Sequence, residues 1–205
     1  MNLKLINDDC MNVMREYPDN YFDLAIVDPP YRDTNQPDQW MRENGSMKPL
    51  EGRPSEEYWE ELLRVSKEHI TWGANNFQLP QWKGFVFWRK TGISNDVHFS
   101  CGEVASLSEG LGTTCKVYDI ATNSKGKIHP TQKPIKLYEW LYDSYAEKGQ
   151  KILDTHLGSG SNAIAAHYAE MGEFVGVELD AGYFNAAKAR IYEETKQVDM
   201  FSVAQ

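Results

Sequence analysis

Cysteine is scarce in this sequence of 205 residues, and its three copies form no metal-binding pattern. Cys10, Cys101 and Cys115 include no C-x-x-C pair, which argues against a structural zinc site and for a reducing compartment. No apolar run approaches the length that spans a membrane, and the N-terminal Met1-Asn2-Leu3-Lys4 lacks the pattern of a signal peptide. We therefore expect a cytoplasmic protein with neither a metal ion nor a membrane partner.

Positive charge is also in short supply, because the formal net charge is −9. The one stretch with an excess of basic residues is 82–136, which carries eight Lys and Arg against four Asp and Glu, or +4. A basic segment in an acidic chain can face phosphate groups, but an ordinary mixed surface accounts for the same count. Both interpretations stay open.

Short apolar runs alternate with amphipathic stretches, and no internal repeat or low-complexity tract interrupts them. This alternation predicts a single doubly wound α/β domain with a mostly parallel, seven-stranded sheet. Residues 32–54 and 112–128 lack periodicity and are predicted as irregular segments. The expected strands are 4–6, 24–27, 70–72, 84–88, 104–107, 151–154 and 174–177, and the expected helices are 10–16, 56–67, 135–146, 162–171 and 181–195.

The most informative motif is Asp28-Pro29-Pro30-Tyr31, which follows the apolar run 22–27. The two prolines fix φ and remove two backbone donors, so the chain stops abruptly and presents carbonyl oxygens. In open α/β sheets, ligands bind at the carboxyl ends of the strands. A carboxylate, a rigid carbonyl and an aromatic ring at such a place suit a flat, weakly nucleophilic amine.

A second motif joins the strand 151–154 to the helix 162–171. Its glycines permit a tight turn and a close backbone approach to a ligand. With an acid at the end of the next strand, it fits a site for an adenosine-containing cofactor, although a plain strand-to-helix connection is also compatible. Asp154 favours S-adenosylmethionine, whose ammonium and sulfonium need a carboxylate. The residues concerned are Asp154, Gly158, Ser159, Gly160, Ser161 and Glu178.

A third cluster, His129-Pro130-Thr131-Gln132-Lys133-Pro134, precedes the helix 135–146. Prolines at both ends favour a rigid loop that presents donors, for example to a cofactor carboxylate near a helix N-terminus. A simple helix entry is an equally good interpretation from the spacing alone.

Taken together, the three motifs resemble those of the amino-group DNA methyltransferases that use S-adenosylmethionine, specifically the permuted beta-type group. That group has the same motif order, and Trp72–Phe77 and Gly84–Lys90 resemble its small phage-type members. The resemblance runs from about residue 3 to 195 and implies one Rossmann-like methyltransferase domain over residues 1–195. Two departures are Thr155-His156, where the family commonly has Pro-Phe, and Arg89, where an acid is frequent.

The resemblance implies a role for each motif residue. Asp28 and the Pro29 carbonyl would accept the amine protons of a flipped-out base, Tyr31 would stack on the base, and Pro30 would shape the turn. Asp154 and residues 158–161 would hold the methionine part of the cofactor, and Glu178 its ribose. Asp9 and Cys10 would lie at the adenine, and Thr131, Gln132 and Lys133 near the carboxylate.

The resemblance also implies the substrate, which is double-stranded DNA methylated at adenine N6, because Asp at the first motif position is typical of that reaction. Cytosine N4 is the alternative, and an RNA or protein amide is another. A catalytically silent DNA-binding partner is disfavoured by the intact Asp28 and Tyr31, and a nicotinamide oxidoreductase leaves that motif without a role. Recognition of the DNA sequence would fall to 32–54 and 91–128, so either the recognised site is short or the enzyme is a homodimer.

The segment 196–205 is predicted as a C-terminal tail. Its Gln197-Val198-Asp199-Met200-Phe201 resembles the peptide by which bacterial replication proteins bind the DNA sliding clamp. An extended segment with two apolar anchors and one amide suits such a groove. A frayed terminus without a partner is an equally good interpretation.

Overall fold

The computed structural model describes residues 1–31, 52–79, 83–94, 100–122 and 126–202, with side chains as far as residue 196. The recognition segment predicted at 32–54 lies outside the described residues except for 52–54. Parts of the second segment, 95–99 and 123–125, lie outside them too.

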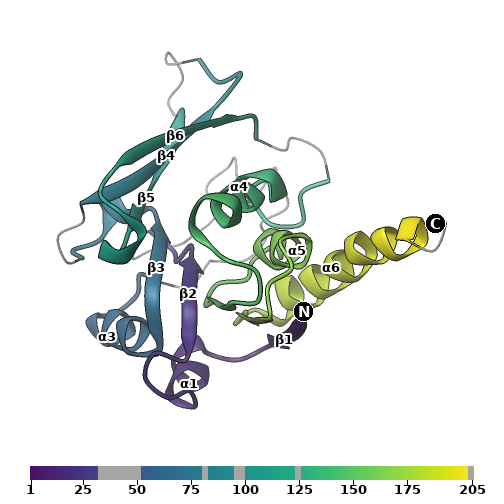
Figure 1. Ribbon diagram of the computed structural model, residues 1–205, viewed down its shortest axis with the longest axis horizontal. Helices are drawn as coiled ribbons and strands as arrows, with labels where there is room; N and C mark the ends of the chain where they lie inside the picture. Colours follow the sequence, from purple (N-terminus) through teal and green to yellow (C-terminus); the bar gives the residue numbers. More distant parts are fainter. Residues whose placement is uncertain (32–51, 80–82, 95–99, 123–125, 203–205) are drawn as a thin grey trace.

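The described residues form an α/β fold around one mixed sheet of eight strands in the order β1-β8-β7-β2-β3-β5-β4-β6 (Figure 1). Only β5 runs antiparallel to its two neighbours, β3 and β4. The predicted fold class is therefore confirmed, with eight strands in place of seven. The strands are β1 (Asn2–Ile6), β2 (Phe22–Val27), β3 (Ser66–Trp72), β4 (Gly84–Lys90), β5 (Gly102–Leu107), β6 (Cys115–Ile120), β7 (Lys151–Asp154) and β8 (Glu173–Val177).

The additional strand is β6, which lies in the segment 112–128 that the sequence predicts as irregular, so that prediction is wrong for residues 115–120. β6 is an edge strand and pairs only with β4 in the described sheet. Its Lys116 and Asp119 interrupt the apolar pattern, and every residue of this edge strand is exposed or half-buried. Val117, Tyr118 and Ile120 nevertheless have the β-branched or aromatic side chains that favour strands.

Helices cover both faces of the sheet, as a doubly wound fold requires. α1 (Cys10–Arg15) and α3 (Glu56–Val65) pack on one face, and Ser55 caps α3 as the sequence predicts, accepting a hydrogen bond from the Tyr58 amide. The other face carries α4 (Ile135–Tyr145), α5 (Ser161–Tyr168) and α6 (Ala181–Ser202). Two short 3-10 turns complete the described elements, at Ala74–Asn76 and Glu109–Leu111.

Two apolar cores, one on each face, fix the register of the central strands. The larger core lies under α4, α5 and α6 and contains Trp72, Trp88 and Ile191. Leu24 of β2 pairs with Ile152 of β7, and Val27 pairs with Thr71 of β3. The carboxyl ends of β2, β3 and β7 therefore lie level at one edge of the sheet, together with those of β1 and β8.

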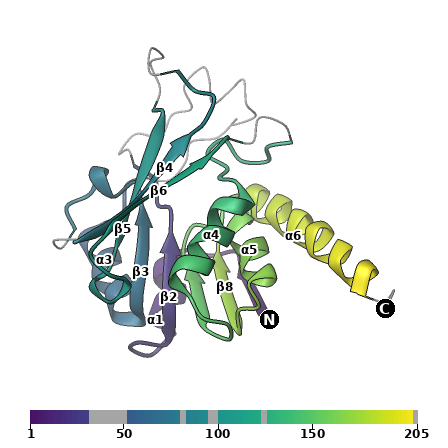
Figure 2. The same cartoon turned by 45° about the horizontal axis from the view of Figure 1, so that its top comes forward.

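The last helix differs most from its prediction, since α6 continues through Ser202 instead of ending at Thr195. Both views show it projecting away from the sheet (Figures 1 and 2). No proline or glycine follows Gly182 before its end, so the chain offers no stop signal. The clamp-binding residues proposed from the sequence, Gln197, Met200 and Phe201, therefore fall in a helix and not in an extended segment, and their side chains lie outside the described part. Clamp binding stays a prediction. No helix in the described ranges is both long enough and apolar enough to cross a membrane.

Candidate active site

The motif Asp28–Tyr31 stands at the carboxyl end of β2, in the middle of the sheet. Asp28 Oδ1 accepts a hydrogen bond of 2.5 Å from the Tyr31 hydroxyl. Asp28 Oδ2 accepts one of 2.5 Å from the Lys133 ammonium, which reaches it from the loop before α4. The first and third sequence motifs therefore meet, and each oxygen of the Asp28 carboxylate already has a donor.

Lys133 makes a second ion pair, because its ammonium also lies 2.9 Å from Glu103 Oε2. Lys90 Nζ lies 2.6 Å from the other oxygen of Glu103. Positive and negative side chains therefore alternate in the order Lys90, Glu103, Lys133 and Asp28. The Lys133 side chain is 3% exposed, and its ammonium lies 5.3 Å from the centre of the Trp72 ring. Two positive and two negative groups thus neutralise one another in a largely buried cluster.

The pKa shifts follow from this pairing. Burial acts to lower the pKa of Lys133, but the charges of Asp28 and Glu103 outweigh it and raise that pKa above the usual value. Burial acts to raise the pKa of Glu103, but Lys133 and Lys90 outweigh it and hold that pKa well below its usual value. Both groups therefore stay charged at neutral pH.

The second motif forms the turn between β7 and α5. Gly158 and Gly160 have φ of 53° and 74°, in the left-handed region, and α5 begins directly after Gly160. The Gly158 amide donates to Glu178 Oε2 at 2.9 Å, so the acid at the end of β8 lies against this turn. Burial raises the pKa of Glu178, against the effect of this hydrogen bond.

Asp154 is a buried carboxylate at the end of β7 and is 3% exposed. It accepts hydrogen bonds from the Asn162 side-chain amide at 3.0 Å and from the His156 backbone amide at 3.1 Å. None of the ion pairs among the described residues involves Asp154, and burial raises its pKa to about 7. A carboxylate in this state is a strong site for a cationic ligand group.

Two contacts join the cofactor motif to the Asp28 side of the edge. Asn162 donates both to Asp154 and, at 3.2 Å, to the Ile26 carbonyl of β2, two residues before Asp28. The His129 ring, at the start of the Lys133 loop, lies beside Gly158 and has its centroid 4.4 Å from that of Tyr183. The three sequence motifs therefore lie together at one edge of the sheet.

The remaining predicted residues lie around this site. Asp9 caps α1 by accepting from the Met11 amide at 2.8 Å, and the Asn7 side chain binds the Glu178 carbonyl at 2.7 Å, which ties the end of β1 to that of β8. Burial raises the pKa of the adjacent Cys10 to about 12, so its thiol is neutral. Three further predicted residues make hydrogen bonds within the loops of the site. Thr131 Oγ1 bonds with His129 Nδ1, Gln132 Oε1 accepts from the Ile128 amide, and the hydroxyls of Ser159 and Ser161 bond with each other.

Comparison with known proteins decides the family. Residues 87–189, half of the chain, match a family model described as DNA methylase, whose name covers N6 and N4 enzymes. The chain belongs to the DNA methylase family. The matched part of this family member contains Glu103, Lys133, Asp154 and Glu178, and Asp28–Tyr31 precede it.

Individual relatives support the same fold. The type II methyltransferase M.HpaI of Haemophilus parainfluenzae is 27% identical over 97% of this chain and 77% of its own length. The crystal structure of an M1.HpyAVI–SAM complex is 16% identical, with a TM-score of 0.64, and covers 92% of this chain and 98% of that one. The cytosine-N4-specific PvuII DNA methyltransferase is 12% identical, with a TM-score of 0.62 over 97% of this chain and 93% of its own. Both structures share the methyltransferase fold with this family member.

At Thr155-His156, where the sequence departs from the family pattern, polar groups and an aromatic contact occur together. The Thr155 hydroxyl lies 2.6 Å from the Tyr58 hydroxyl and 2.9 Å from His156 Nδ1. The His156 ring also packs edge-on against Tyr58, with centroids 5.7 Å apart. Burial lowers the pKa of His156 to about 4, so the ring is neutral and serves as an aromatic side chain.

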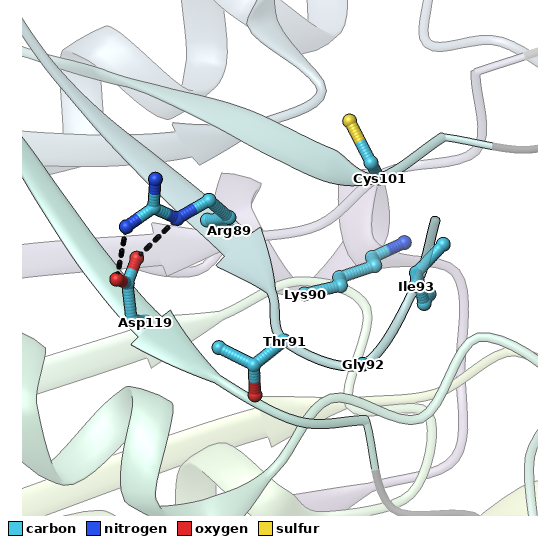
Figure 3. Close-up of a pocket in the computed structure, with 7 residues that line it drawn as sticks. All are labelled: Arg89, Lys90, Thr91, Gly92, Ile93, Cys101 and Asp119. Atoms are coloured by element: carbon cyan, nitrogen blue, oxygen red, sulfur yellow. Dashed lines mark hydrogen bonds and ion pairs between the residues drawn. The ribbon is translucent and has the colours of Figure 1, made fainter. Parts of the chain in front are cut away.

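Arg89, the other departure, lies beside a surface hollow of about 390 Å³ at the carboxyl ends of β4 and β6. Figure 3 shows Arg89 facing Asp119, with which it makes an exposed ion pair, while Lys90 points the opposite way. Among the described basic residues between 82 and 136, ion pairs with acids are made by Lys83, Arg89, Lys90 and Lys133. Part of the positive charge of this segment is therefore neutralised by acidic side chains of the same protein.

Sequence reasoning does not identify Glu103, Lys90 or Asn162 as site residues. Glu103 stands at the amino end of β5, which reaches the same edge only because β5 runs antiparallel. The sequence does not distinguish Glu103 from the other three acids in 82–136. Asn162 has a clearer signal, since a polar residue at the second position of an otherwise small and apolar buried helix needs a partner.

Gly73 offers a test of the position of Tyr31. It has φ of +67°, and a Cβ added there would lie 2.0 Å from Tyr31 Cε1. We expect Gly73→Ala to displace the Tyr31 ring and lower the methylation rate by about 100-fold, because small misplacements at a reacting centre cost that much. Turnover and thermal unfolding, measured on the same preparation, separate the two effects.

Gly149→Ala is the matched control, because Gly149 has φ of +84° with nothing near its Cβ position. Both variants carry a backbone cost of about 1–2 kcal/mol, but only Gly73→Ala meets the ring. Equal turnover in the two variants would show that the Tyr31 position is unimportant.

Proposed function

We propose that this chain transfers a methyl group from S-adenosylmethionine to the exocyclic amino nitrogen of a base flipped out of DNA, at adenine N6. One observation carries the proposal. Asp28 and Tyr31 lie at the same edge of the sheet as Asp154, Glu178 and the glycine turn before α5. Family membership supports the reaction class.

The residues around β7 and β8 fit the cofactor. Asp154 is an unusually basic, buried carboxylate suited to the cofactor ammonium, and the positive φ of Gly158 and Gly160 opens the turn for a close approach. Glu178 would hold the ribose hydroxyls, with Asp9 and Cys10 near the adenine. When bound, the cofactor supplies an electrophilic methyl carbon on a sulfonium.

The residues after β2 fit the base. An aromatic amine delocalises its lone pair into the ring, so Asp28 and the Pro29 carbonyl act by accepting the two amine protons and drawing the nitrogen towards tetrahedral geometry. Tyr31 holds the ring of the base by stacking. The cofactor would supply the methyl group to this nitrogen and leave as a neutral thioether, and the displaced amine proton would pass through the Asp28 carboxylate to solvent. Proximity supplies much of the acceleration.

Adenine is preferred over cytosine because the motif begins with Asp28, as is typical of the adenine enzymes that the sequence resembles. Cytosine N4 is the rival, since the family name includes N4 enzymes and a cytosine-N4-specific enzyme shares the fold. Asp28 and its partners suit either amine.

One labelling experiment separates these substrates. The protein is incubated with tritiated S-adenosylmethionine and unmethylated genomic DNA, the DNA is digested to nucleosides, and the labelled base is identified. We expect label in N6-methyladenine. Label in N4-methylcytosine would show that the target base is cytosine. Label found only in RNA or protein would show that the substrate is not DNA.

A further inference from the structure

Both oxygens of the Asp28 carboxylate accept a hydrogen bond before any base arrives. Its Oδ1 accepts a hydrogen bond from the Tyr31 hydroxyl and its Oδ2 accepts one from the Lys133 ammonium, each at 2.5 Å. Each oxygen keeps a second lone pair, but these two donors compete with the amine of a base, so Asp28 becomes a stronger acceptor when one of them moves to another acceptor. Lys133 cannot simply be released, because an ammonium in a site this buried is strongly destabilised without a carboxylate partner.

Glu103 lies within reach of both donors. Its Oε2 is 2.9 Å from Lys133 Nζ and 3.4 Å from the Tyr31 hydroxyl. Its Oε1 is held by Lys90 at 2.6 Å, so the carboxylate is fixed with Oε2 towards the site. The Glu103 side chain is 21% exposed, which leaves it less hydrated than a surface carboxylate and strengthens its hold on the ammonium.

We propose that Glu103 is a positioning residue that takes over Lys133 and the Tyr31 hydroxyl while Asp28 receives the amine protons of the target base. The inference rests on the proposed function. Glu103 touches neither the base nor the cofactor in this scheme, and it acts by giving the two donors an alternative acceptor. Lys90 keeps Glu103 in place and completes the charge balance.

The test is Glu103→Gln, which keeps the size and one acceptor oxygen but removes the charge. We expect the single-turnover methylation rate to fall about 10- to 100-fold, because Lys133 then stays on Asp28. Binding of S-adenosylmethionine alone should change less than about twofold. The matched control is Glu109→Gln, an exposed carboxylate paired with Lys83, which should keep the wild-type rate.

The pH profile separates this role from a purely structural one. Both carboxylates raise the pKa of Lys133, so removing the charge of Glu103 lowers it. If activity needs the ammonium, the alkaline fall in rate should move to lower pH in Glu103→Gln. Glu103→Asp restores the charge and should restore the wild-type alkaline limb, although its shorter side chain lowers the rate. If Glu103→Gln does not fold, the rate of Glu103→Asp carries the test.

The outcomes distinguish the inference from the function that it rests on. Wild-type rate and pH profile in the folded Glu103 variant, together with an inactive Asp28→Asn, would overturn the role of Glu103 and leave the proposed function intact. Activity in Asp28→Asn would overturn both.

Discussion

Replacing Asp28 by Asn is expected to reduce methyl transfer by about 10³-fold or more, which is the size of effect seen when a preorganised charge at a reacting centre is removed. Asn keeps the shape of the side chain but offers the amine a single neutral oxygen. Lys133 retains Glu103 as a partner, so the protein should fold. The measurement is the single-turnover rate, with binding of S-adenosylmethionine expected to remain detectable.

Asp23→Asn is the matched control for this variant. Asp23 lies at the opposite end of the same strand and pairs with its own lysine, with Oδ1 2.6 Å from Lys67 Nζ. It therefore repeats the chemical change in β2 away from the carboxyl edge and should leave the rate close to that of the wild type. Persisting activity in Asp28→Asn would mean that the chemistry takes place elsewhere.

The fold could be predicted because strands buried on both faces have continuous apolar runs, and β2, β7 and β8 are of this kind. The errors fall where burial is incomplete. Every residue of β6 is exposed or half-buried, and β3 begins at Ser66 instead of Ile70 because its first residues are polar. A strand that is partly exposed to solvent gives a weaker signal than a strand in the core.

The site was predictable as far as strand direction allowed. Asp28 and Glu178 follow parallel strands and Asp154 ends one, so the three residues lie at the same edge once the sheet is assumed parallel. Glu103 lies at the amino end of its strand and joins them only through the reversal of β5, which no local pattern in the sequence encodes. The position of Lys133 between two carboxylates likewise depends on tertiary packing. Its predicted contact with the cofactor carboxylate stays a prediction.

Asp154→Asn should raise the apparent dissociation constant for S-adenosylmethionine about 100-fold or more, because a buried cationic group of the ligand would lose its counter-charge. The side chain keeps its shape, and its oxygen can still accept from Asn162 or from the His156 amide. Isothermal titration calorimetry measures the loss directly. Glu170→Gln, an exposed carboxylate paired with Lys148, is the control and should bind the cofactor as the wild type does.

The same substitution should stabilise the cofactor-free protein at alkaline pH. Burial raises the pKa of Asp154 to about 7 from a usual value of 3.8, so holding it ionised in the folded state opposes folding. By linkage this cost grows as the pH rises from about 4 and levels off above about 7, at about 4 kcal/mol for a shift of about three units. Asp154→Asn should therefore increase the free energy of unfolding at pH 8 by up to that amount and change it little at pH 4.

The affinity for S-adenosylmethionine should depend on pH through the same carboxyl group. Below about pH 7 the free carboxyl of Asp154 is protonated, and a cationic ligand must displace that proton, so wild-type affinity should fall towards tenfold for each further unit of acidification. Asp154→Asn has no proton to displace and should lack this slope between pH 5 and 7. A wild-type affinity that is flat across that range would mean that the ammonium binds elsewhere. The buried charge at the end of β7 would then have to be explained without the cofactor.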